Sequence, residues 1–167
     1  MLMCYPLVLT PDENGTVMAT FPDVPQARTV APDEESALER AHDALCVALA
    51  MLMDRDRDVP APGEQAPGQL SVPVSTMVAA KLAVYQAMRE QDLSRRALGA
   101  MLGLDEKQIR RLLDLEHHSR WNQLELALRA LGRGLIVEVR RVRPVVPSPA
   151  MRAGGRRRIS APKAAGT

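Results

Sequence analysis

The sequence predicts an α+β protein, in which a small antiparallel sheet with one helix precedes a helical domain that ends in a short strand. Apolar residues recur at helical spacing from Ser75 as far as Gly132, whereas shorter apolar segments separated by turn residues dominate before it. The charge also changes sign, because residues 1–70 carry 12 acidic and 4 basic side chains and residues 71–143 carry 8 and 13. We therefore predict two domains with these boundaries, and two different partners for them.

The first domain begins with a pattern typical of a β-hairpin. Tyr5–Thr10 and Thr16–Phe21 are rich in apolar and β-branched residues, and the Pro-Asp-Glu-Asn-Gly segment between them consists of turn formers. Two further short strands are expected at Ala27–Val30 and Leu70–Val74. Together these segments predict a single antiparallel sheet.

One helix is expected across the face of this sheet. Asp33 is a typical N-cap, and the acids that follow it face the positive end of the helix dipole. Apolar side chains then recur at helical spacing as far as Met53. Prolines and glycines in Asp54–Gln69 predict a loop.

The second domain is expected to contain four helices, each with a start signal. The first runs from Ser75 to about Glu90, and the next three are expected to begin at caps Ser94, Asp105 and Asn122. Three residues after the last two caps stand the capping-box partners Gln108 and Glu125. Glycines at 132 and 134 end the last helix, and Leu135–Val142 is then expected to form the closing strand. A basic tail at 144–167, rich in Pro, Ala and Gly, is expected to be disordered.

The segment Leu93–Leu113 is typical of a helix-turn-helix. One helix ends at Leu102, a tight turn contains Gly103, and Gly99 is small where the two helices must cross. We expect four outward side chains of the second helix to contact bases in the major groove: Glu106, Lys107, Arg110 and Arg111. Phosphate contacts are expected from Ser94, Arg95, His118, Ser119 and Arg120. The alternative is that a basic helix face is merely solvated.

Other classes of function receive no support from the composition. Cys4 and Cys46 are far apart and lack a spacing that would bind metal, so we expect buried thiols, no metal site and no cofactor. His117 and His118 are expected to be loop residues. No apolar run approaches the ~18 residues of a membrane span, and we expect a soluble, cytoplasmic protein.

Taken as an ordered set, the motifs resemble the HicB antitoxin family, in its subtype with a helix-turn-helix. The resemblance covers residues 1–142, although Gln26-Ala27 departs from the usual pair and the tail has no counterpart. The segments that carry it are Tyr5-Pro-Leu-Val-Leu-Thr10, Phe21-Pro-Asp-Val-Pro25, the acidic helix from Asp33 to Met53, the loop with Pro60 and Pro62, Ser75-Thr-Met-Val-Ala-Ala-Lys-Leu82, Leu98–Leu113, His117-His118 and Ala130-Leu-Gly-Arg-Gly-Leu135.

The resemblance implies a truncated ribonuclease-H-like first domain without catalysis, which fits a first strand, Met3–Thr10, that has no carboxylate. It also implies a small basic HicA-like ribonuclease toxin as partner, neutralised by the first domain, and repression of the operon by a dimer on operator DNA. Candidate toxin contacts are Asp23, Val24, Glu34, Glu35 and Glu39, although such acids often serve only to solubilise a helix. Candidate dimer-strand residues are Leu135, Ile136, Val137 and Val139.

Two other functions compete with this interpretation. A transcription repressor with a ligand-sensing first domain would need a pocket lined by convergent polar groups. A nuclease would need inward carboxylates on adjacent strands, which the sequence does not provide. We therefore expect a protein that is not an enzyme.

Overall fold

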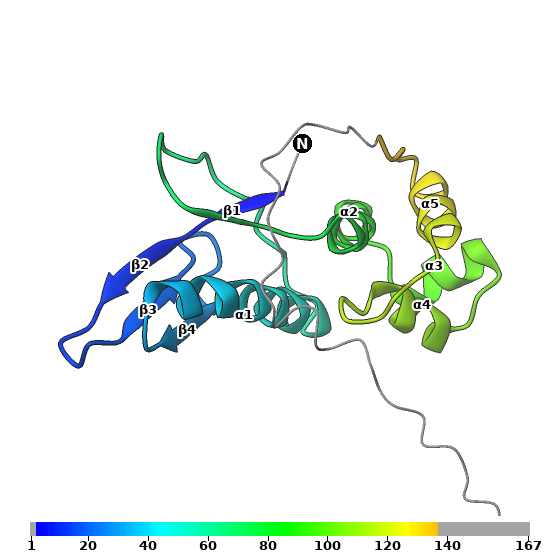
Figure 1. The fold of residues 1–167 in the computed structure, drawn as a ribbon. Coiled ribbons are helices and arrows are strands. Elements are labelled where there is room, and N and C mark those ends of the chain that lie inside the picture. Colours follow the sequence, from blue (N-terminus) through cyan, green and yellow to red (C-terminus); the bar gives the residue numbers. More distant parts are fainter. Residues whose placement is uncertain (1–2, 137–167) are drawn as a thin grey trace, which may run out of the picture. The chain divides into compact units, whose positions relative to one another are not determined.

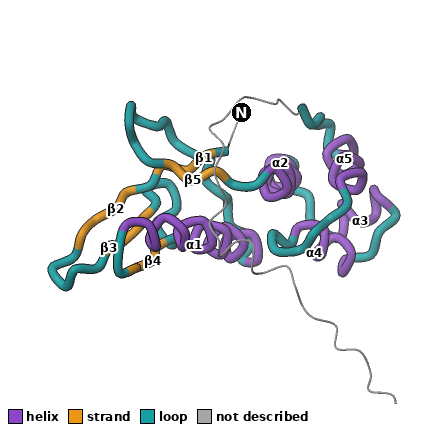
Figure 2. Tube along the Cα trace, in the orientation of Figure 1, coloured by secondary structure: helices purple, strands orange, loops and turns teal. Residues whose placement is uncertain are grey.

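The structure is a computed structural model that describes residues 3–136. The chain divides into two units, Met1–Leu135 and Ile136–Thr167, and of the second only Ile136 lies among the described residues. Within residues 3–136 there are five strands and five helices, so the predicted α+β class is confirmed (Figures 1 and 2). The elements are β1 (Cys4–Pro6), β2 (Val8–Pro11), β3 (Val17–Thr20), β4 (Arg28–Ala31), α1 (Glu34–Asp54), β5 (Ser71–Pro73), α2 (Thr76–Glu90), α3 (Arg95–Leu102), α4 (Glu106–Leu113) and α5 (Trp121–Ala130).

The strands form two small antiparallel sheets instead of the single predicted sheet. The predicted strand at Tyr5–Thr10 is interrupted at Leu7, whose backbone N–H donates to Leu70 O at 2.8 Å. Before this point β1 pairs with β5, and after it β2 pairs with β3 in the expected hairpin. The expected third strand is β4, which pairs with β3 at the register Met18↔Val30. A change of pairing partner within one strand therefore divides the sheet.

Helix α1 covers the inner face of the β2–β3–β4 sheet (Figure 1). Its buried side chains recur at helical spacing and are Ala37, Ala41, Leu45, Ala48, Leu49 and Met53. The predicted cap is present, since the Asp33 carboxylate accepts from Ser36 N at 2.8 Å. Hydrogen bonds from the backbone N–H and the hydroxyl of Ser36 lower the pKa of Asp33. Arg40 reaches the open edge of β4 and donates to Val30 O at 3.1 Å, which satisfies a carbonyl at that edge.

The helices of the second half begin as predicted, except for the last. Ser75 and Ser94 accept from the backbone at their helices' third residues, and Asp105 forms a full capping box with Gln108. Helix α5 instead begins at Trp121, so Asn122 lies inside it, and the N-cap residue makes no side-chain hydrogen bond. The predicted box partner of Asn122 pairs elsewhere, because Glu125 accepts from Arg129 one turn later at 2.8 Å.

The spacing of Trp121 and Leu126 around the predicted cap Asn122 is typical of a hydrophobic staple, but no staple forms there. Trp121 is 44% exposed and Leu126 is 56% exposed, so neither side chain is packed over the helix start. The structure instead buries Leu124, Ala127 and Leu128. A single hydrophobic core connects the sheets, α1 and the four later helices.

Candidate functional site

The helix pair α3–α4 has the tight connection that the sequence predicts. Gly103 ends α3 with φ +66°, a left-handed conformation that suits glycine. Leu104 N then donates to Gly99 O at 2.9 Å, which closes the turn. A Cβ atom on Gly99 would lie 2.6 Å from Leu104 O and 3.5 Å from Ile109 Cγ1. Gly99 therefore permits the close approach between α3 and the start of α4.

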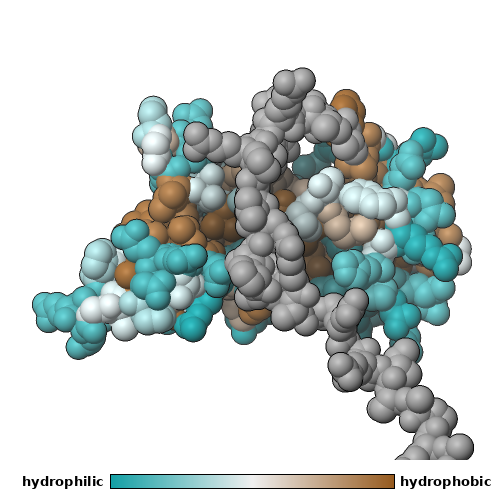
Figure 3. Space-filling view, viewed as in Figure 1, coloured by the Kyte–Doolittle hydropathy of each residue, from teal (hydrophilic) through white to brown (hydrophobic). Residues whose placement is uncertain are grey.

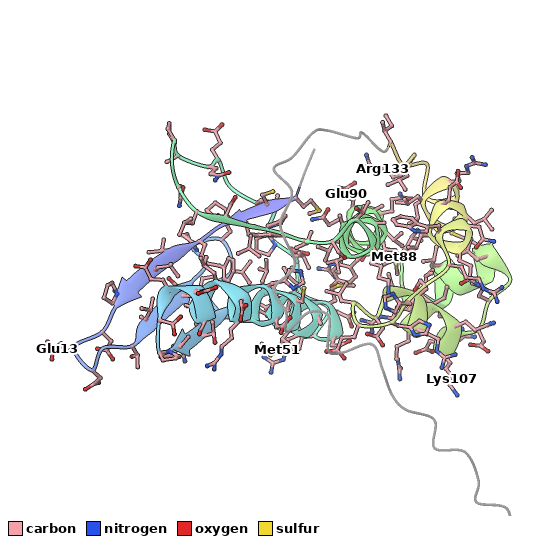
Figure 4. The ribbon with its side chains drawn as sticks, in the orientation of Figure 1. Glu13, Met51, Met88, Glu90, Lys107 and Arg133 are labelled. Atoms are coloured by element: carbon pink, nitrogen blue, oxygen red, sulfur yellow. The ribbon has the colours of Figure 1, made fainter. Side chains whose placement is uncertain are left out.

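Helix α4 presents a charged face to solvent. Ile109, Leu112 and Leu113 are buried, whereas all four residues predicted to contact bases are exposed: Glu106, Lys107, Arg110 and Arg111. Lys107 points away from the other helices (Figure 4), and the surface over α3 and α4 is largely hydrophilic (Figure 3). Arg110 Nη2 lies 3.4 Å from Glu106 Oε1, an exposed pair one turn apart.

The residues predicted to contact phosphates lie at two places near this face. Ser94 Oγ accepts from Ala97 N at 3.1 Å, so its oxygen serves as the cap of α3. His118 and Arg120 are exposed in the loop between α4 and α5, and Ser119 Oγ donates to Leu112 O at 3.4 Å. Arg95 differs from the others, because its guanidinium is held by Met53 in the last turn of α1 and by Asp56 just after that helix.

A residue that sequence reasoning missed holds the loop after α4. Lys81 on α2 is 0% exposed, and its ammonium donates to the carbonyl oxygens of Asp114 and His117. Burial lowers the pKa of Lys81, an effect that the nearby charge of Asp114 partly opposes. The signal was present in the sequence, since Lys81 lies on the same helical stripe as Val78 and Tyr85.

The acidic candidates divide into exposed and supporting residues. Glu34, Glu35 and Glu39 are exposed on the first turns of α1. Asp23 is half-buried, and one of its carboxylate oxygens accepts from Gly63 N at 2.9 Å. Val24 is 0% exposed, so its predicted contact with a partner is wrong: the side chain packs into the core beneath the loop.

The predicted dimer strand falls mostly beyond the described residues. Leu135 and Ile136 are described, belong to no strand, and are 37% and 93% exposed. Val137 and Val139 lie outside the described residues, as does the tail at 144–167. Pairing with a second copy therefore stays a prediction.

The two cysteines are free and half-buried, and burial raises the pKa of the Cys46 thiol. In residues 3–136 no cluster of three or more His, Cys, Asp and Glu side chains is placed to hold a metal ion. Over the same residues, none of the helices combines the length and apolar character needed to cross a membrane.

The family model and the individual relatives that match this chain all point to the same family. The HicB-like family, described as the HicB_like antitoxin of bacterial toxin–antitoxin systems, matches residues 4–83. Antitoxin HicB 1 of Photorhabdus laumondii is 31% identical over 137 residues, which are 82% of this chain and 87% of the relative. Antitoxin HicB of Escherichia coli K12 is 30% identical over 133 residues, or 80% of this chain and 96% of the relative. Antitoxin HicB of Pseudomonas fluorescens is 33% identical over 131 residues, or 77% and 88%. With an identity of this level over most of both chains, the protein belongs to the HicB-like family of antitoxins.

Proposed function

We propose that this antitoxin has two activities: its N-terminal part covers the active site of a small HicA-like ribonuclease, and its helical part represses the operon by helix-turn-helix binding to operator DNA. The first domain would extend to about residue 70 and the second over 71–143. The observation that carries the proposal is the opposite charge on two exposed helix faces, acidic at the start of α1 and basic on α4.

The proposed DNA contact rests on the geometry of α3 and α4. The buried face of α4 packs into the core, which leaves Lys107, Arg110 and Arg111 free to enter a major groove about 12 Å wide. His118 and Arg120 in the next loop are exposed and would reach the phosphates beside that groove. Arg110 also forms an exposed pair with Glu106, which would cost little to break on binding.

The proposed toxin contact rests on charge and on the absence of catalytic groups. Glu34, Glu35 and Glu39 give α1 an acidic start that complements a basic ribonuclease and would accelerate encounter. None of the five strands between residues 3 and 136 carries an Asp or Glu, which supports binding instead of metal-dependent cleavage. The N-terminal part would therefore act as a cap on the toxin and not as an enzyme.

A dimer would fit this function best. A twofold-symmetric protein on an operator with inverted half-sites places its two recognition helices about 34 Å apart. We propose that residues 135–142 pair with the same segment of a second copy. Sedimentation of a chain truncated after Gly134 tests this, because an unchanged dimer would rule out that pairing.

Substitution on α4 tests the DNA-binding activity. Arg111→Ala and Lys107→Ala should each weaken operator binding by roughly 1–3 kcal/mol if the side chains contact bases. The matched control is Arg129→Ala on α5, which removes an exposed arginine that is paired with Glu125 and lies outside α3 and α4. Equal operator affinity of Arg111→Ala and the wild type would show that α4 is not the recognition helix.

Co-expression tests the neutralising activity. The small basic protein encoded in the neighbouring reading frame should arrest growth when expressed alone, and this chain should restore growth. Pull-down of the same protein by the purified chain links rescue to direct binding. Growth arrest that persists with a soluble, folded antitoxin would contradict the proposal.

One observation favours a second function, a repressor that senses a small ligand. A hollow of about 370 Å³ lies at the end of α1 and is lined by Gln26, Met51, Leu52, Arg55 and Arg57. Two arginines beside apolar side chains could bind an anionic ligand there. Operator affinity that stays unchanged across a panel of small organic anions would remove this alternative.

A further inference from the structure

The last two residues of α1 and the loop that follows them are fixed to helix α2 near the middle of the segment. We call this segment, Met53–Gly63, the strap. The Tyr85 hydroxyl donates to Arg57 O at 2.7 Å, and Arg89 Nε donates to Asp58 Oδ1 at 2.9 Å. Gln86 Nε2 donates to Val59 O at 3.5 Å. Three consecutive strap residues, at positions 57–59, are therefore held by side chains of one helix.

The same strap holds the first residue of α3. Arg95 Nη2 donates to Met53 O at 2.6 Å and lies 3.4 Å from Asp56 Oδ1. The Arg95 side chain is only 21% exposed. Asp56 itself has φ +49°, a left-handed conformation that Asp and Asn tolerate better than most residues. The guanidinium thus connects the end of α1 to the start of α3.

The other end of the strap is fixed to the N-terminal strands and loop. The Tyr5 hydroxyl donates to Pro60 O at 2.9 Å, and Gly63 N donates to the Asp23 carboxylate at 2.9 Å. Pro60 and Pro62 restrict the backbone between these contacts. Both ends and the middle of the strap are therefore hydrogen-bonded to the rest of the fold.

We propose that Arg95 is a positioning residue for DNA recognition, which fixes the pose of α3 and α4 by anchoring them to the strap through Met53 and Asp56. This inference rests on the proposed DNA binding, and it replaces the phosphate contact that the sequence predicts for Arg95. Helix α3 leads directly into the tight turn at Gly99–Leu104, so a tilt at its first residue is transmitted to the exposed face of α4.

Neutralising Asp56 distinguishes a role of Arg95 in positioning α3 from a direct contact of Arg95 with phosphate. If Arg95 contacted phosphate, Asp56→Asn would remove a competing acid and strengthen operator binding. If Arg95 positions α3, the same substitution weakens operator binding by about tenfold, the size of one lost base contact. Asn tolerates the left-handed backbone as well as Asp, so the change is confined to the charge.

Salt dependence of operator binding provides the second readout, measured on the full chain with its own promoter fragment. A phosphate contact contributes about 0.9 to the slope of log affinity against log salt. We expect Arg95→Gln to weaken binding with an unchanged slope, and Arg95→Lys to restore part of the affinity. The matched control is Glu125→Gln, which breaks the exposed Arg129 pair on α5 and should not weaken operator binding.

The outcomes distinguish this inference from the proposed function. If the wild type does not bind the promoter fragment at low salt, both are wrong. If it binds, and Arg95→Gln lowers the slope by about one while Asp56→Asn tightens binding, only the positioning role is wrong. If Asp56→Asn and Arg95→Gln both lower the urea concentration at which the protein unfolds, while the folded variants bind the operator as tightly as the wild type, the contact is purely structural and the inference is also overturned.

Discussion

The N-terminal part and the helical part of this antitoxin hold their loops with different kinds of buried polar group. In the N-terminal part, the neutral hydroxyl of Tyr5 donates to Pro60 O at 2.9 Å. In the helical part, the charged ammonium of Lys81 donates to the carbonyls of Asp114 and His117. Both side chains are 0% exposed. A loop can thus be fixed by a hydroxyl whose pKa is raised by burial or by an amino group whose pKa is lowered by burial.

The two groups respond to alkaline pH in opposite directions. Burial, assisted by the charge of Asp23, raises the pKa of Tyr5 to about 12, so the folded protein retains a proton that the unfolded chain loses above pH 10. The contribution of Tyr5 to stability therefore falls as pH rises through that window. Burial lowers the pKa of Lys81, so below 10.5 the unfolded chain binds more protons than the folded one, and this contribution rises with pH.

The largest loss of stability is expected at Gly99, where the backbone of α3 lies against the backbone that leads into α4. Gly99→Ala would place a Cβ atom 2.6 Å from Leu104 O, a backbone atom that cannot move without opening the turn. We expect the free energy of unfolding to fall by about 3 kcal/mol, measured by urea denaturation. Gly134→Ala is the matched control, because its Cβ would meet nothing within 4 Å. Equal stability of the two variants would contradict the tight approach of α3 and α4.

The second effect concerns the charged anchor of the helical part. Lys81→Met keeps a long side chain but leaves His117 O without its donor, so we expect a loss of about 2 kcal/mol. The rise of stability with pH below 10.5 should also disappear. Lys107→Met, at an exposed position of α4, should change stability little. A stability of Lys81→Met at or above that of the wild type would show that the loop does not need the ammonium.

The third effect concerns the neutral anchor of the N-terminal part. Tyr5→Phe should cost about 1 kcal/mol at neutral pH through the lost hydrogen bond to Pro60 O. Between pH 10 and 12 the wild type should lose about 2 kcal/mol more than Tyr5→Phe, since only the wild type has a hydroxyl to ionise there. Unfolding free energies across this range give the comparison. Parallel pH profiles for the two proteins would contradict a raised tyrosine pKa.

Local signals in the sequence were sufficient for most of the elements. The caps at Asp33, Ser75, Ser94 and Asp105 each bond a residue three positions later, so the local sequence alone was sufficient to locate those helix starts. At α5 the same reasoning failed, because Asn122 resembles a cap while Glu125 is taken by Arg129 one turn later. The spacing of the residues alone does not show whether Glu125 bonds to the backbone of Asn122 or to the side chain of Arg129.

Contacts between distant residues were not predictable. The interruption at Leu7 depends on Leu70 O, and the burial of Lys81 depends on carbonyls more than thirty residues away. The exposed faces of α1 and α4 followed from helical periodicity, so their charged residues were identified correctly as surface residues. The sequence predicted a phosphate contact for Arg95, whereas in the structure its guanidinium donates to Met53 O of the strap.

The smallest effect is expected on the acidic face of α1. Neutralising Glu34, Glu35 and Glu39 together to Gln should slow association with the proposed basic toxin by about tenfold at low salt and change the dissociation rate little, because rim charges steer encounter. The difference should vanish in high salt. The matched control removes equal charge elsewhere, through Glu13→Gln, Glu64→Gln and Glu116→Gln, all of them exposed. If both triple variants slow association equally in stopped-flow measurements, overall charge and not the α1 face guides the toxin, and the contrast between an acidic α1 and a basic α4 carries no specific recognition.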